Sequence, residues 1–217
     1  MIHDGRSNKF PFDREEAIEH LKASDAKLGA LIEKAGPFTM RLDALPSPFE
    51  SLLESILYQQ LHGKAAATIH RRVREHFGGD PTPQLMIDAP DERLRGCGVS
   101  GNKIKAMKDL AAKTLDGTVP THAAIKKMSD EEIVERLTAV RGIGPWTVEM
   151  LLIFRLGRPD VLPADDFGVR NGFRLAYHKR ALPKPKDLLR FGARWRPHAT
   201  AAAWYLWRAA DAAQKKK

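Results

Sequence analysis

Helix start signals recur along the whole chain and constrain its fold more than any other sequence feature. Ser47-Pro48-Phe49-Glu50 and Ser129-Asp130-Glu131-Glu132 have the pattern of capping boxes, and Thr82-Pro83 places proline at a first helical position. Further helix starts are expected at Asp13, Ser24 and Ser100, with stops at Gly36-Pro37, Gly78-Gly79 and Asp116-Gly117. Strand-type alternation of apolar and polar residues is nearly absent, and only residues 37–45 and 158–163 look extended. We therefore predict an all-α fold of about ten short helices.

Composition narrows the classes of protein that the chain can be. Its 217 residues are 43% hydrophobic and 29% charged, which is enough to bury a core in one large domain or two small lobes. The lone Cys97 excludes an internal disulfide, a thiolate zinc site and an iron–sulfur cluster, and it favours a reducing compartment. No apolar stretch approaches the roughly 20 residues of a membrane span, and no apolar run marks a signal peptide. We expect no membrane association and a cytosolic or nuclear protein, cytoplasmic if bacterial and nuclear if eukaryotic.

The positive charge is concentrated in the last quarter of the chain. The net charge is +9, yet residues 170–217 alone hold 13 basic and 2 acidic side chains. Lys215, Lys216 and Lys217 are expected to form a solvated tail, whereas the other basic residues alternate with apolar ones and indicate a folded basic surface. A one-sided basic surface favours a polyanionic partner, because neutralised phosphates release condensed counterions. Nucleic acid is the expected partner.

Residues 137–152 carry the most specific pattern in the chain. They read Leu-Thr-Ala-Val-Arg-Gly-Ile-Gly-Pro-Trp-Thr-Val-Glu-Met-Leu-Leu, so apolar residues flank Gly142 and Gly144. Two glycines one residue apart let the backbone turn sharply and approach a ligand closely. A helix that begins at Pro145 would direct its first N–H groups, with those of Trp146 and Thr147 among them, toward an anion. The pattern predicts a turn between two helices that binds phosphate.

This segment resembles the helix-hairpin-helix of DNA glycosylases. Leu162-Pro163-Ala164-Asp165-Asp166-Phe167-Gly168-Val169-Arg170 is similar to the aspartate motif that follows the hairpin in that family. The resemblance runs from about Ser47 to Arg208 and is to the compact branch of the 3-methyladenine-DNA glycosylase II family. It implies a bilobal helical fold with a DNA-binding, active-site cleft between two lobes. Residues 46–161 would form the lobe that ends in the hairpin, and residues 1–45 would pack with residues 162–217.

The resemblance places catalysis on the second aspartate of the motif, Asp166. Hydrolysis of an N-glycosidic bond passes through an oxocarbenium-like sugar, so a carboxylate is needed to stabilise positive charge and to orient a water. A base alkylated on a ring nitrogen is already cationic and leaves without strong acid help. We expect Asp165 to cap the following helix or support the site, and Asp166 to act on the substrate.

The target base must leave the duplex, and aromatic faces hold an extruded cationic purine well. By resemblance Trp146 and Trp207 match pocket positions, with Tyr58 and Tyr205 as further candidates, while Trp195 is expected to be structural. The family also fills the vacated space with a side chain from the loop after the first matched helix. Alignment on Gln59-Gln60 makes Gln60 this wedge, with Leu61 and His62 as rivals.

The resemblance also carries expectations about cofactors, partners and alternative functions. No cofactor is required, although family hairpins can bind a monovalent cation through backbone carbonyls, here those of Thr138 and Val140. The expected protein is a monomer that excises alkylated purines from damaged double-stranded DNA in base excision repair. The alternatives are a glycosylase for other damaged bases and a catalytically silent DNA-binding protein, against which Asp166 argues. A strand-cleaving lyase needs a lysine where Trp146 stands, and no lysine lies between Lys127 and Lys179.

Overall fold

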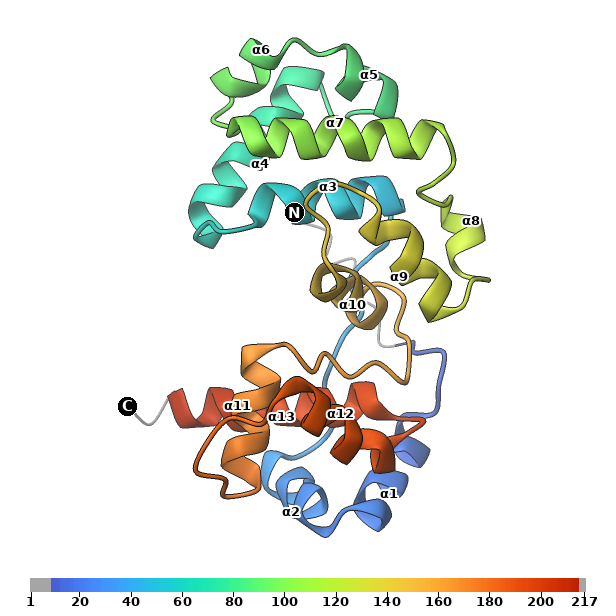
Figure 1. Cartoon of the computed structure of the whole chain (residues 1–217), viewed down its shortest axis with the longest axis vertical. Coiled ribbons are helices and arrows are strands. Elements are labelled where there is room, and N and C mark those ends of the chain that lie inside the picture. The colour runs from blue at the N-terminus through green and yellow to red at the C-terminus, as the bar shows by residue number, and fades with distance from the viewer. Residues whose placement is uncertain (1–8, 215–217) are drawn as a thin grey trace. The chain divides into compact units, whose positions relative to one another are not determined.

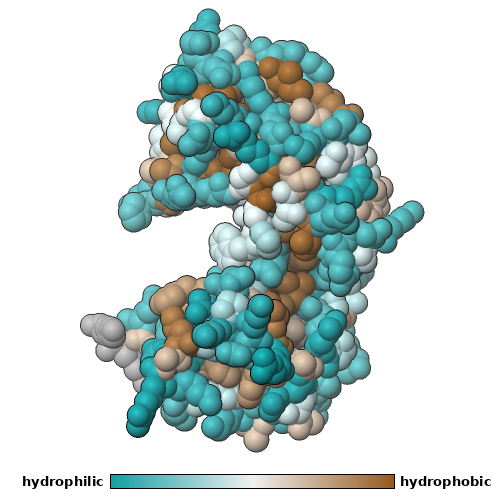
Figure 2. Space-filling model, viewed as in Figure 1, coloured by the Kyte–Doolittle hydropathy of each residue, from teal (hydrophilic) through white to brown (hydrophobic). Residues whose placement is uncertain are grey.

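The computed structural model describes residues 9–214, and this part of the chain contains thirteen α-helices, one 3-10 helix and no β-strand. The all-α prediction is confirmed. Helices outnumber the expected total of about ten because short ones, such as α6 (Asp91–Gly96) and α8 (His122–Ile125), are too brief to show a periodic pattern. Hydrophilic side chains cover most of the face shown in Figure 2. No helix within the described residues is both long and apolar enough to cross a bilayer.

The chain forms two compact units, which we call unit 1 and unit 2. Unit 1 comprises Met1–Ala44 and Glu149–Lys217, and unit 2 comprises Leu45–Val148. The expected discontinuous layout had its second boundary after residue 161, whereas the structure has it inside α10 (Pro145–Phe154). The physical reason is that residues after Val148 bond to unit 1: the Asp43 N–H donates to the Phe154 carbonyl at 2.8 Å, and the Val161 N–H donates to Thr200 Oγ1 at 3.0 Å.

Unit 2 is built around one long helix. Its helices are α3 (Pro48–Tyr58), α4 (Gly63–Phe77), α5 (Pro83–Asp88), α6, α7 (Gly101–Leu115), α8, α9 (Asp130–Thr138) and the first turn of α10. Helix α7 packs on both α3 and α5 (Figure 1), and it buries Ile104, Met107 and Leu110 completely. Because these residues recur at helical spacing, one face of α7 forms the centre of the unit.

The predicted caps explain where several of these helices begin. Ser47 accepts the N–H of Glu50 at the start of α3, and Thr82 accepts the N–H of Leu85 at the start of α5. At α9 both hydrogen bonds of the capping box between Ser129 and Glu132 are present. Side-chain caps satisfy N–H groups that have no partner inside the helix, so they set the first residue of each helix.

Unit 1 contains the two terminal segments of the chain. Its helices are α1 (Arg14–Ser24), α2 (Ala26–Ala35), the remainder of α10, α11 (Phe167–Ala176), α12 (Pro185–Gly192), the 3-10 helix η1 (Ala193–Trp195) and α13 (Ala199–Gln214). Helices α11 and α13 approach each other at Gly172, where a Cβ atom would lie 1.9 Å from the carbonyl oxygen of Leu206. Only glycine fits there, and this close packing holds the start of α11 beside α13.

Helix α2 is capped by Asp25 rather than by the expected Ser24. One oxygen of Asp25 accepts the N–H groups of Lys27 and Leu28. Its other oxygen accepts the Tyr177 hydroxyl at 2.6 Å and the Trp195 indole N–H at 3.1 Å. Asp25 therefore ties α2 to the basic C-terminal segment, and the fully buried Trp195 is structural, as predicted.

Candidate active site and DNA-binding hairpin

The hairpin turn, residues 139–144, joins α9 to α10. Gly142 has φ +79°, a left-handed conformation that side chains other than glycine rarely adopt. The Ile143 N–H donates to the Val140 carbonyl at 3.1 Å, and the Ile143 side chain is buried. The predicted sharp turn between two helices is present, and its shape depends on the first glycine.

The N–H groups of Gly142 and Gly144 form no hydrogen bond within residues 9–214. A Cβ atom on Gly144 would meet no heavy atom within 4 Å, so the backbone there is open to approach. The Thr147 N–H, in contrast, donates to the Gly144 carbonyl at 3.0 Å. This corrects the expectation that the Thr147 amide is available to a ligand, because the first turn of α10 is tight enough to use it.

Two polar side chains to which sequence analysis gave no role hold the hairpin turn in place. Asp109 on α7 accepts the Arg141 N–H at 2.7 Å, and the Gln59 amide donates to the Gly142 carbonyl at 2.9 Å. Burial raises the pKa of Asp109, but the Arg141 N–H and the Lys113 ammonium outweigh it and keep that pKa below its usual value. Both partners lie more than 30 residues from the turn, so no local pattern could reveal them.

The candidate wedge lies in residues 59–62, which connect α3 to α4 and are called the wedge turn below. Gln60 has φ +56°, which is uncommon for a residue other than glycine. The side chains of Gln60, Leu61 and His62 are all exposed, and His62 precedes α4 without making a side-chain cap. Three consecutive side chains therefore project from this turn, and which of them acts as the wedge stays a prediction.

Asp166 is the N-cap of α11. Its Oδ1 atom accepts the Val169 N–H at 2.8 Å and the indole N–H of Trp207 at 2.8 Å. Asp165 is exposed and makes no cap. The capping role expected of Asp165 thus belongs to Asp166, since only the second carboxylate is placed over the first turn of the helix. Two donors from different helices fix the orientation of the Asp166 carboxylate.

Trp207 reaches Asp166 because its ring lies in a slot of matching shape. The ring stacks on Phe154, with centroids 5.6 Å apart and planes inclined by 29°. On the α11 side a Cβ atom at Gly168 would lie 2.8 Å from Trp207 Cδ1, so a larger residue at position 168 would displace the indole. Phe154 and Gly168 are site residues that sequence reasoning missed.

Glu149, on α10, is a second acidic group of this site. Its pKa is raised to about 7 by burial and by the negative charges of Asp165 and Asp166. A carboxyl group with this pKa is largely protonated at mildly acidic pH, whereas ordinary glutamates are ionised there. The site therefore holds one carboxyl group whose charge changes near neutral pH.

The remaining aromatic candidates differ in what they can offer a ligand. Trp146 is 48% exposed and belongs to unit 2, as does the half-buried Tyr58, whose ring meets the edge of His70. Tyr205 is only 1% exposed and donates its hydroxyl to the Gly36 carbonyl. Tyr205 is a core residue and presents no face to a base, which corrects its assignment as a candidate. The helical spacing near Trp204 could have indicated this burial.

The basic C-terminal segment is folded, as predicted. Phe173, Tyr177 and Leu188 are buried between the charges, whereas Leu189 is half exposed. Lys179, Arg180, Arg190 and Arg194 are exposed, and the Arg194 guanidinium lies 3.9 Å from the centre of the Phe191 ring. The three terminal lysines lie outside the described residues.

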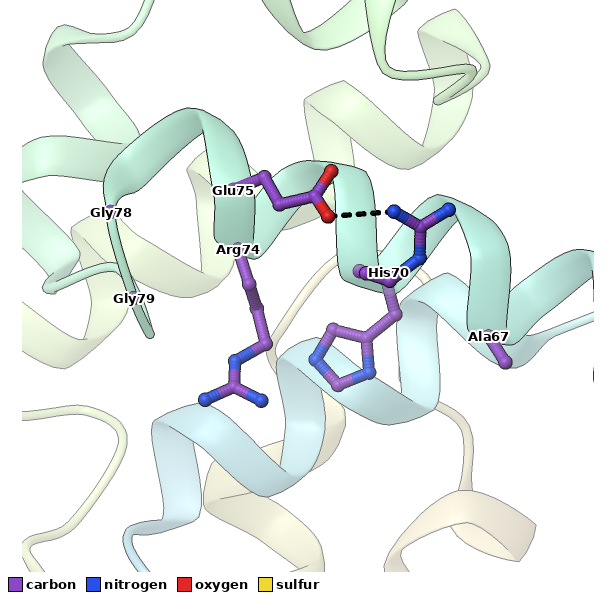
Figure 3. A pocket seen from close by; sticks show the side chains of 7 residues that line it. Ala67, His70, Arg74, Glu75, Gly78 and Gly79 are labelled. Carbon is purple, nitrogen blue, oxygen red and sulfur yellow. Dashed lines mark hydrogen bonds and ion pairs between the residues drawn. The ribbon is translucent and has the colours of Figure 1, made fainter.

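A hollow of about 450 Å³ lies along α4, between Ala67 and the two glycines that follow the helix. Figure 3 shows His70 and Arg74 pointing the same way from this helix, with Glu75 bonded to the neighbouring arginine. Arg71 is paired with Glu75 and Arg74 with Asp80, each at 2.6 Å. No predicted site residue lines this hollow, and its arginines are already paired with carboxylates.

Within residues 9–214 no group of three or more His, Cys, Asp or Glu side chains could hold a metal ion. The expected cation would use backbone carbonyls instead. The Val140 carbonyl accepts the Ile143 N–H, and Thr138 donates its hydroxyl to the Val134 carbonyl. A cation at the hairpin stays a prediction.

Two helices joined by a turn with accessible amides, followed by an aspartate that caps a later helix, place the chain in the helix-hairpin-helix class. Residues 53–197 match the model of the HhH-GPD superfamily of base excision DNA repair proteins, and the chain belongs to that family. Within the superfamily it belongs to the 3-methyladenine-DNA glycosylases, as its relatives show.

Three comparisons illustrate the relationship. The chain is 40% identical over 201 residues to DNA-3-methyladenine glycosylase 1 of Schizosaccharomyces pombe, covering 91% of this chain and 88% of that protein. The structure of the S. pombe 3-methyladenine DNA glycosylase with abasic DNA is similar with a TM-score of 0.75, covering 89% and 95% of the two chains at 40% identity. A DNA-3-methyladenine glycosidase from Bacillus halodurans has a TM-score of 0.84 at 35% identity, covering 92% and 91%.

Proposed function

We propose that this protein is a monofunctional DNA glycosylase that removes alkylated purines of the 3-methyladenine type from duplex DNA. The observation that carries the proposal is the Asp166 carboxylate, held by N–H donors from Val169 and Trp207. Membership of the 3-methyladenine-DNA glycosylase family supports the substrate class.

Asp166 supplies what the hydrolysis of a cationic nucleoside requires. As the glycosidic bond stretches, positive charge develops on the sugar, and an oriented carboxylate stabilises that charge and aligns a water for attack. The proton of the water passes to the carboxylate or to solvent, while the neutral base departs. The orientation is fixed before substrate arrives, so no free energy is spent on arranging the carboxylate in the transition state.

DNA binding is assigned to the hairpin turn and to the basic surface. The amides of Gly142 and Gly144 would bind phosphate, and the exposed Trp146 would stack on a base. Trp207 already uses its indole N–H on Asp166, so its part in binding is limited to its ring. We propose that the protein acts as a monomer, without a required cofactor, in the compartment that holds the DNA.

Excision of 3-methyladenine from a defined duplex tests the proposal directly. We expect Asp166→Asn to lower single-turnover excision by at least about a hundredfold, because it removes the charge that acts on the transition state. Binding of undamaged duplex should change less than about twofold, and Asp165→Asn is the matched control.

Product strands should break only after added alkali, since no lysine lies near the hairpin in sequence. Excision by Asp166→Asn at the wild-type rate would contradict the catalytic assignment. Strand cleavage without alkali would show a lyase instead.

A further inference from the structure

The wedge turn has an unusual support on its inner side. The side chain of Lys103, on α7, donates to the Leu57 carbonyl at 2.6 Å and to the Gln59 carbonyl at 2.8 Å. These carbonyls lie at the C-terminal end of α3, where backbone oxygens lack partners inside the helix and the helix dipole is negative. The lysine is partly buried, and burial lowers its pKa. A buried ammonium is costly, so two strong acceptors are needed to compensate for it.

The second of these hydrogen bonds fixes the peptide plane from which Gln60 projects. The Gln59 carbonyl belongs to the peptide plane that joins Gln59 to Gln60, and φ of Gln60 is the rotation about the N–Cα bond that leaves this plane. The bond to Lys103 fixes the orientation of this plane, from which Gln60 continues the chain at φ +56°. The direction in which the exposed side chains of the wedge turn project depends on this bond.

Gln59 also links the wedge turn to the hairpin turn. Gln59 gives its backbone carbonyl to Lys103 and its side-chain amide to the Gly142 carbonyl at 2.9 Å. On α7 the next residues of the same face meet the hairpin itself: a Cβ atom at Gly142 would lie 3.5 Å from Ala106 Cβ, and Asp109 accepts the Arg141 N–H. Residues 103, 106 and 109 lie on one face of α7, because they are three apart. Helix α7 thus supports two turns whose bonded residues, Gln59 and Gly142, are 83 positions apart in sequence.

We propose that Lys103 and Gln59 are positioning residues that lock the wedge turn to the hairpin turn, so that insertion of the wedge is coupled to the grip of the hairpin on the DNA backbone. This inference rests on the proposed function, because it assigns a part in base extrusion to both turns. Opening a base stack costs free energy, because stacking is lost. A wedge held in place loses little conformational entropy when it enters the stack, whereas a mobile turn must be ordered at that moment.

The test uses a duplex that already contains a stable abasic-site analogue, so it needs no catalysis. A 2-aminopurine placed beside the analogue becomes more fluorescent when its stack is opened. For Lys103→Met we expect affinity for this duplex to fall roughly tenfold, because the released turn must then be ordered when it enters the stack, and the fluorescence rise to disappear. Binding to undamaged duplex, which uses phosphate contacts, should stay within about twofold of the wild type.

Three further variants separate positioning from general stability. Lys103→Arg keeps the donors and should restore most of the fluorescence change, while Lys105→Met, at an exposed position of α7, is the matched control and should behave like the wild type. Gln59→Leu should reproduce the loss. Combining it with Lys103→Met should add little, because the two residues act as one unit.

The outcomes distinguish this inference from the proposed function. If Lys103→Met shows the fluorescence rise and the abasic-site affinity of the wild type, the inference is overturned. The proposed excision of alkylated bases is not contradicted by that result. Equal losses on abasic and undamaged duplex, with a lowered melting temperature, would also overturn it, because they indicate a purely structural lysine. A wild-type protein that opens the abasic stack but excises no alkylated base would instead contradict the proposed function.

Discussion

At the scale of single residues, the indole N–H of Trp207 is the contact that joins an aromatic ring of the site to the Asp166 carboxylate. It donates to the same Asp166 oxygen that caps α11, while its ring stacks on Phe154. Trp207→Phe keeps an aromatic ring against Phe154 and removes only the donor. We expect single-turnover excision to fall roughly tenfold, the effect of one hydrogen bond to a charged group. An unchanged rate, with the fold intact by circular dichroism, would show that the α11 cap alone orients the carboxylate.

Because of its raised pKa, Glu149 makes the free energy of unfolding depend on pH. The folded state binds its proton more tightly than the unfolded chain does, since the pKa rises from 4.5 to about 7. The stability contributed by this proton is complete below pH 4.5 and is lost as pH rises toward about 7, because the unfolded state then releases its proton more readily. Glu149→Gln removes this loss, so the variant should gain about 1–3 kcal/mol over the wild type between pH 5 and pH 8.

Urea unfolding at both pH values measures this gain, with Glu149→Gln compared against Glu135→Gln at an exposed position of α9. If the Glu149→Gln advantage is the same at both pH values, the carboxyl group does not titrate in that range and the charges of Asp165 and Asp166 are not acting on it.

At the scale of elements, the hairpin turn can be tested through its second glycine. Gly142 is unsuitable because its φ is positive, but Gly144 has no such constraint and no atom near its Cβ position. Gly144→Val should leave the free energy of unfolding within about 0.5 kcal/mol of the wild type. It should weaken binding to any duplex roughly tenfold, by blocking a phosphate from the amides. Gly96→Val, at another open glycine, is the control, and equal affinity of the two variants would remove the hairpin from the DNA interface.

Sequence predicts elements well where the determining interactions are local. Ser129 and its capping box lie within four residues, and Gly142 needs only its own backbone, so both were predictable. Lys103 and Asp109 act on segments that are distant in sequence, and nothing in their neighbourhood marks them. The choice between Asp165 and Asp166 as helix cap depended on a single residue of register, which no pattern fixes.

At the scale of the whole molecule, the boundary between the two units is hard to predict for the same reason, because it depends on contacts between residues that are distant in sequence. The sequence predicted that the N-terminal residues pack with the C-terminal ones, but the boundary inside α10 depends on contacts such as that between Phe154 and Trp207. Helix α10 carries Trp146 in one unit and Glu149 in the other. A periodic apolar pattern predicts that the helix exists, but it does not predict which unit each turn of the helix packs against.

The charge distribution of the whole chain sets how binding depends on salt. With a net charge of +9 and exposed arginines and lysines after residue 170, about four neutralised phosphates are expected, which gives a slope near −3.6 for log K against log salt. Replacing Lys179 and Arg180 with glutamine should make this slope less steep by up to about 1.8, if both contact phosphate. The same replacement at the exposed Lys126 and Lys127 lowers the net charge equally but lies in unit 2, outside the basic segment. If the basic segment contacts the DNA, only the replacement of Lys179 and Arg180 changes the slope. Equal changes for both pairs would mean that net charge alone attracts the DNA.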